Sequence, residues 1–175
     1  MAVSYVPAGA HRSAVVGHLL SFALLLVCVS AQFAWPGWLK LYGQAPDLTL
    51  AAVISLGLTT GGSFGAVAGF LGAFLWASVA ALPMGNLFIS HMGLGFLAGA
   101  MRGRMFSDRL SLAMILIAAG VVVAAIVNLL LAPPPNPQAW VSTVLARAVY
   151  AALATMVIYP LVRLLARYYP EPEEL

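Results

Sequence analysis

Residues 61–81 read GGSFGAVAGFLGAFLWASVAA, and this stretch decides the fold because a small residue recurs at every fourth position. In an α-helix of 3.6 residues per turn, positions four apart lie on one slowly drifting face. The small residues of this face are Gly61, Gly65, Gly69, Ala73, Ala77 and Ala81. Most of the other positions are large and apolar. The stretch therefore predicts a helix with one smooth face and one bulky face.

A second helix of the same kind is predicted after Pro83, where Gly95, Gly99 and Gly103 again stand four residues apart. In a bilayer, lipid tails are as apolar as leucine, so helices associate through close backbone contacts across small residues and through interhelical hydrogen bonds. We therefore predict that both sets of small residues form helix-packing seams. The alternative is that Gly and Ala are simply frequent in apolar helices.

The composition indicates an integral membrane protein. Of the 175 residues, 63% are hydrophobic and only 7% are charged, whereas a soluble domain carries roughly 25% charged residues. The net charge is +3, but the eight basic residues are too few and too dispersed for a nucleic-acid surface. The single cysteine, Cys28, allows no intrachain disulfide, and no Cys/His spacing typical of a metal site occurs. We expect no metal and no cofactor.

Apolar segments predict an all-α polytopic membrane protein with six transmembrane helices. These helices are expected at residues 13–34, 48–60, 62–82, 86–101, 110–132 and 138–166. Residues 1–12 would form an N-terminal lead, 13–167 the transmembrane domain and 168–175 a C-terminal tail. A site resembling that of signal peptidase occurs at Val29-Ser30-Ala31, but the apolar run around it is longer than the roughly 7–15 residues of a signal peptide.

The second segment, residues 48–60, is the ambiguous one. Its 13 residues cover about 20 Å at 1.5 Å per residue, so it could be re-entrant or interfacial, or it could span with local thinning of the bilayer. Asp47 directly precedes it and is expected to be its N-cap, at the rim of the bundle.

Basic residues predict the orientation, because cytoplasmic loops collect Lys and Arg near helix ends. With six crossings and the N-terminus inside, Lys40 alone faces outward and Arg147 lies within the membrane. The cytoplasmic side then holds Arg12, Arg102, Arg104, Arg109, Arg163 and Arg167. If residues 48–60 did not cross, Arg102 and Arg104 would fall opposite Arg12. We therefore predict six crossings, with both termini in the cytoplasm.

Arg147 needs a polar environment, because insertion scales put a mid-membrane arginine at about 2.5–3.5 kcal/mol unfavourable. With Asp47 at the rim, no acidic residue is expected inside the bundle. The sequence thus predicts an outward-opening polar cavity with partners at similar depth, namely Asn86, His91, Asn128 and Ser142 or Thr143. The alternatives are that Arg147 snorkels to the outer interface or bonds backbone carbonyls.

Residues 61–65, GGSFG, match the G-x-S-x-G pattern of serine hydrolases. A nucleophilic serine needs a histidine at its own depth, yet His91 is expected near the outer end of its helix. His18 is at a closer depth, but no third orienting group is evident. We interpret the pattern as a glycine-rich turn with a serine helix cap. No carboxylate pair, HExxH, P-loop or CxxC occurs either, so the sequence predicts no enzyme.

Several short motifs resemble the family of the rod shape-determining protein MreD. They are Gly69-Phe70-Leu71-Gly72, Pro83-Met84-Gly85, Gly95-Phe96-Leu97-Ala98-Gly99 with basic residues after it, Pro46-Asp47-Leu48 and the run from Tyr150 to Pro160. The length and the six-helix layout are similar too, so the resemblance covers about residues 13–167. Two positions depart from the family. Many relatives carry an aspartate where this chain has Ala77, and an asparagine often found near Thr155 and Met156 is missing.

The resemblance implies a non-enzymatic scaffold of the bacterial cell-wall elongation (rod) complex, in the cytoplasmic membrane, which supports side-wall peptidoglycan synthesis and cell shape. Its expected partner is MreC, a single-pass protein with a periplasmic domain. RodA, a class B penicillin-binding protein and the MreB filament are further expected partners. The family fold is similar to that of the substrate-binding subunits of energy-coupling-factor vitamin transporters. The alternative function is therefore a solute-binding membrane subunit that uses the cavity around Asn86, His91 and Arg147.

Overall fold

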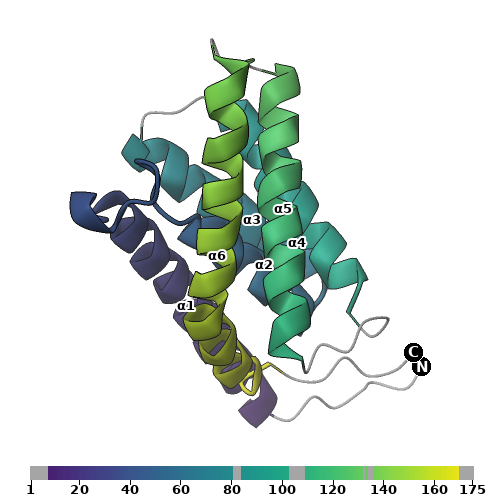
Figure 1. Ribbon diagram of the computed structural model, residues 1–175. Coiled ribbons are helices and arrows are strands. Elements are labelled where there is room, and N and C mark those ends of the chain that lie inside the picture. The colour runs from purple at the N-terminus through teal and green to yellow at the C-terminus, as the bar shows by residue number, and fades with distance from the viewer. Residues whose placement is uncertain (1–7, 81–83, 103–108, 132, 134–135, 170–175) are drawn as a thin grey trace.

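The computed structural model describes residues 8–80, 84–102, 109–131, 133 and 136–169, and these residues form a bundle of six α-helices (Figure 1). The helices are α1 (Ala8–Phe33), α2 (Leu48–Thr60), α3 (Gly62–Ala80), α4 (Met84–Ala100), α5 (Leu110–Leu131) and α6 (Pro137–Ala166), with a 3₁₀ turn, η1 (Gly37–Leu39), after α1. The number and order of the predicted helices are therefore confirmed within the described residues, and α2 has the predicted bounds.

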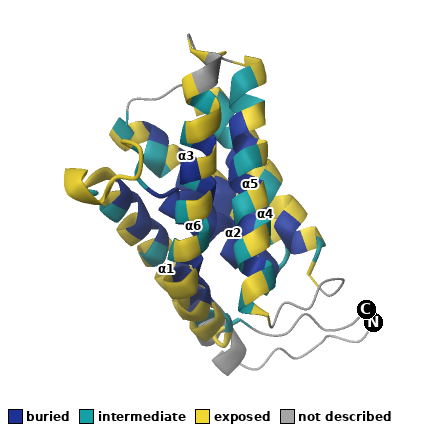
Figure 2. Cartoon of the chain, in the orientation of Figure 1, coloured by how far each residue is buried: buried dark blue, intermediate teal, exposed yellow. Residues whose placement is uncertain are grey.

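Helix α2 is the centre of the bundle. Every residue from Leu48 to Leu58 is buried, and α2 contacts all five other helices. Dark blue α2 accordingly lies behind the half-exposed α5 and α6 in Figure 2. A helix that is apolar on all sides belongs in such an interior. Other helices therefore surround residues 48–60 on all sides.

Four helices are long and apolar enough to cross a membrane: α1 from Val15, α3, α5, and α6 from Ala139. Helix α4 has 17 residues and α2 has 13. The chain is thus a multi-pass membrane protein. The last described residue, Tyr169, contacts α1, because its hydroxyl group lies 2.8 Å from the hydroxyl group of Ser21. Figure 1 shows the start of α1 and the end of α6 at the same end of the bundle.

Loop residues hold α6 in place near its start. The Asn136 side chain accepts a hydrogen bond from the Ala139 amide at 3.3 Å, and Pro137 occupies the first helical position, an arrangement that satisfies a free amide and fixes the backbone angle. Farther along, the Tyr150 hydroxyl donates to the Leu39 carbonyl at 2.6 Å. Pro134 and Pro135, which precede α6, lie outside the described residues.

Candidate functional site

Helices α3 and α4 touch through their glycines. A methyl group added at Gly65 would overlap the carbonyl of Gly95, and one at Gly69 would overlap the carbonyl of His91. Gly95 is equally confined, because its methyl group would overlap the carbonyl of Gly65 and lie 2.9 Å from a methyl of Val53. Only glycine fits at these positions, as expected where membrane helices pack backbone to backbone.

The other predicted seam residues occupy three kinds of position. Ala73 and Ala77 are buried on α3. Gly61 ends α2 with a φ of +112°, and a methyl group at Gly99 would overlap the Gly61 backbone. Ala81 and Gly103 lie outside the described residues. The structure thus brings together the seam residues on α3 and α4 with the turn that joins α2 to α3.

Two further glycines at these contacts were missed. A methyl group at Gly57, on α2, would overlap the carbonyl of Gly95, and one at Gly65 would lie 2.8 Å from the Gly57 Cα atom. Three helices therefore meet at three glycines. Gly57 stands four residues before Gly61, so extending the repeat backward finds it. Gly72 faces Val53 of α2, and nothing in the four-residue repeat predicts it.

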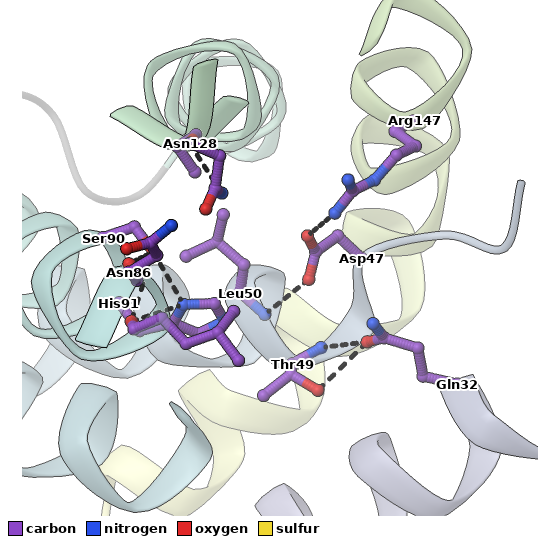
Figure 3. Close-up of polar contacts among 11 residues, drawn as sticks. Gln32, Asp47, Thr49, Leu50, Asn86, Ser90, His91, Asn128 and Arg147 are labelled. Atoms are coloured by element: carbon purple, nitrogen blue, oxygen red, sulfur yellow. Dashed lines mark hydrogen bonds and ion pairs between the residues drawn. The ribbon is translucent and has the colours of Figure 1, made fainter. Parts of the chain in front are cut away.

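The partner of Arg147 is Asp47, so the expectation that no acidic residue lies inside the bundle is wrong. The Arg147 Nη2 atom lies 2.6 Å from Asp47 Oδ2, and Asp47 is 5% exposed. The other carboxylate oxygen, Oδ1, accepts the Leu50 amide at 3.3 Å (Figure 3), which confirms the predicted N-cap. The prediction that Asp47 lies at the rim of the bundle was wrong, because α2 begins inside the bundle and its N-cap residue therefore lies there too. Each carboxylate oxygen thus has a hydrogen-bonding partner.

The side chains predicted to surround Arg147 bond to their own helices instead. Asn128 donates to the Ala124 carbonyl at 2.9 Å. Ser142 and Thr143 donate to the Ala139 carbonyl at 3.0 and 2.8 Å. Polar side chains in membrane helices often satisfy themselves in this way, through the carbonyl one turn back. As partners of the guanidinium, these three residues were predicted wrongly.

His91 belongs to a separate polar group on α4. It is 3% exposed, and its Nδ1 atom lies 3.1 Å from the Leu87 carbonyl and 3.2 Å from the Ser90 hydroxyl. That hydroxyl also lies 2.9 Å from the Asn86 carbonyl. Figure 3 shows Asn86 and His91 on one side of Leu50, with the ion pair on the other. Buried His91 Nε2 has no hydrogen-bonding partner among the described residues.

A buried glutamine links α1 to α2. The Gln32 Oε1 atom accepts both the amide and the hydroxyl of Thr49, each at 3.0 Å (Figure 3). This contact was not predicted from the sequence. The available signal was a single amide side chain near the end of the apolar run 13–34, but the sequence does not show which helix faces it.

The residues of the G-x-S-x-G pattern lie beside an aromatic cluster. Ser63 is exposed in the first turn of α3. The His18 ring packs edge-on against Phe64 and Tyr169, at centroid distances of 5.2 and 5.3 Å. Within the described ranges, no three His, Cys, Asp or Glu side chains gather as a metal site would require. Cys28 is buried in α1.

Comparison with known proteins leaves this geometry as the main guide to function. No protein-family model, curated protein or solved structure matches the chain.

Proposed function

We propose that this chain is a non-enzymatic scaffold of the bacterial cell-wall elongation complex, of the MreD kind, and that it binds the single-pass protein MreC in the cytoplasmic membrane. The observation that carries the proposal is the ion pair between Asp47 and Arg147. It neutralises the one charged group of α6 that the sequence assigns to the membrane interior. The ion pair thereby connects α6 to the start of α2. Because Asp47 already neutralises the Arg147 guanidinium, that charge is not available to bind a solute.

The motifs that resemble the MreD family coincide with contacts inside the bundle. Gly69 and Gly95 are at the contact of α3 with α4, and Asp47 supplies the carboxylate of the ion pair. Of the residues at the two departures, Ala77 and Thr155 are interior, at 2% and 0% exposed, whereas Met156 is 53% exposed on the outer surface of α6. A scaffold requires only outer helix surfaces that a partner can contact, and neither departure introduces a charge there.

The outer surface offers bulky apolar faces for a partner helix. On α6, large side chains recur at every fourth position and are each more than half exposed, namely Leu145, Val149, Leu153 and Val157. This spacing places them on one face. Lipid covers such a face in the isolated protein, and a single transmembrane helix replaces lipid through close packing. The proposal assigns the MreC helix to an apolar face of this type.

One observation favours the solute-binding alternative. His91 Nε2 is buried and has no hydrogen-bonding partner among the described residues, and a buried polar atom of this kind calls for a bound water or ligand. The position of Arg147 argues the other way, because its charge is already paired with Asp47. The two functions therefore differ in whether a small molecule lies beside His91.

The test is purification of the tagged full-length chain from native membranes in mild detergent, followed by mass spectrometry of both proteins and small molecules. The proposal predicts a single-pass partner with an extracytoplasmic domain, at a ratio near one to one. His91→Phe provides the matched comparison, and we expect it to retain the partner. A stoichiometric small molecule that is lost from His91→Phe, together with no co-purified partner, would establish the solute-binding alternative instead.

A further inference from the structure

A basic groove lies where α2, α4 and α6 end. Its volume is about 870 Å³, within the range of small-molecule sites. It is lined by Thr59 of α2, by Arg102, which is two residues after the end of α4, and by Arg163 and Arg167 of α6. Arginines from two distant parts of the sequence therefore line one recess, Arg102 on one hand and Arg163 and Arg167 on the other. From the sequence, all three arginines were expected only to determine the orientation of the chain in the membrane.

The path of α6 accounts for the groove. Pro160 lies inside α6 and lines the recess, and a proline within a helix removes one backbone hydrogen bond and bends the helix. Beyond it, Tyr169 is held against α1 by its 2.8 Å hydrogen bond to Ser21. The last turns of α6 thus lean toward α1 (Figure 1), which leaves space beside the ends of α2 and α4.

Among the residues that the structure describes, every charged side chain that lines the groove is an arginine. Asp47 is the one carboxylate in the described part of the chain, and it lies at the opposite end of α2, bonded to Arg147. The C-terminal end of α2 contributes a partial charge of about −0.5, which is small beside the guanidinium charges of Arg102 and Arg167. A planar guanidinium also forms paired hydrogen bonds with phosphate oxygens. The chemistry of the groove therefore matches a phosphate group.

We propose that the groove binds the phosphodiester head group of an anionic phospholipid. The apolar residues that line it decide between a lipid and free phosphate. Val157, Leu161 and Leu164 line the groove and are each about half exposed or more, so they offer an apolar wall to an acyl chain. Basic recesses between membrane helices on the cytoplasmic side bind anionic head groups in this way, and the orientation predicted from the basic residues puts the groove on that side.

The experiment uses the full-length protein in nanodiscs of phosphatidylcholine that contain increasing fractions of phosphatidylglycerol. Native mass spectrometry counts retained phosphatidylglycerol, and the unfolding temperature reports its stabilising effect. We expect one tightly held phosphatidylglycerol per chain. The double variant R102Q/R167Q should weaken its apparent affinity by about thirtyfold, because each arginine near an anionic lipid contributes about fivefold. R102K/R167K, which keeps both charges, should bind within a few fold of the wild type.

The matched control is Lys40→Gln, which removes a positive charge from the loop between α1 and α2 and should leave retention unchanged. Circular dichroism of each variant checks that the fold persists. Three results would overturn the proposal. They are equal retention of phosphatidylcholine and phosphatidylglycerol, wild-type affinity in folded R102Q/R167Q, and equal stabilisation by inorganic phosphate in pure phosphatidylcholine, which would identify a site for a free anion.

Discussion

Arg147 Nη2 lies 2.6 Å from Asp47 Oδ2, although the two residues are 100 positions apart in the sequence. The same carboxylate caps α2 through the Leu50 amide. One side chain thus fixes where α2 begins and where α6 lies beside it. Because α2 contacts every other helix, this contact positions the centre of the bundle.

Removing the arginine of this pair alone should cost more than removing both partners. Arg147→Gln leaves a buried carboxylate unpaired, which typically costs roughly 3–5 kcal/mol. Asp47→Asn should destabilise the protein less than Arg147→Gln does, because the amide oxygen of the new asparagine can still cap α2. The Arg147 side chain is also 35% exposed, so it can reach toward the membrane interface. The double variant D47N/R147Q should be more stable than Arg147→Gln alone. Thermal unfolding of the four proteins in detergent measures this cycle, and additive losses would contradict a direct pair.

A matched pair of glycines on α4 tests the packing of α3 against α4. Gly95→Ala places a methyl group against the Gly65 carbonyl, whereas a methyl group at Gly93 meets nothing within 4 Å. Overpacking costs about 1–3 kcal/mol, so Gly95→Ala should lower the unfolding temperature. Gly93→Ala should leave it unchanged or raise it, since alanine favours a helix over glycine by up to about 1 kcal/mol. Equal effects at the two positions would show that the close contact is absent.

The polar link between α1 and α2 should make a modest contribution. Gln32→Leu removes the acceptor of both hydrogen bonds from Thr49, and interhelical hydrogen bonds in membranes contribute about 0.6 kcal/mol on average, with a maximum near 1.7. We expect a loss of about 1 kcal/mol in the free energy of unfolding, measured by denaturation in mixed micelles. Thr49→Val serves as the partner variant. If the two losses simply add in the double variant, the side chains do not interact.

Cysteine labelling tests the orientation. Lys40→Cys and Arg102→Cys, introduced into a Cys28→Ser background, should react with a membrane-impermeant maleimide from opposite sides of the membrane. Cys28 is buried, so the native thiol should contribute little even before its replacement. In intact spheroplasts we expect labelling at residue 40 alone, and at residue 102 only after lysis. Labelling of both positions in intact spheroplasts would exclude the predicted crossings.

The sequence was sufficient to predict the helices and much of the contact between α3 and α4, because both follow from local periodicity. The bounds of α2 were predicted from Asp47, which precedes the helix, and from Gly61 and Gly62, which follow it. The position of Asp47 could not be predicted in the same way. A short apolar helix between two loops looks as if it starts at the membrane surface, and only the surrounding helices determine how deep it begins.

Contacts between segments far apart in the sequence were the other feature that was predicted wrongly. Asn128, Ser142 and Thr143 seemed suitable partners for Arg147 because their expected depths agreed. Depth along a helix does not give the direction of a side chain, and each of the three bonds to a carbonyl one turn back. Gly57 is different, since it continues the four-residue repeat and was predictable from sequence.

The most direct test of the central claim, that the paired charges inside the bundle are structural and the chain acts as a scaffold, is recovery of the single-pass partner with D47N/R147Q. The measurement is the ratio of partner to bait, purified from native membranes and quantified by mass spectrometry. We predict a ratio equal to that of the wild type in the folded double variant. Loss of the partner from a folded D47N/R147Q protein, or a small molecule present with the wild type and absent from the variant, would contradict the account.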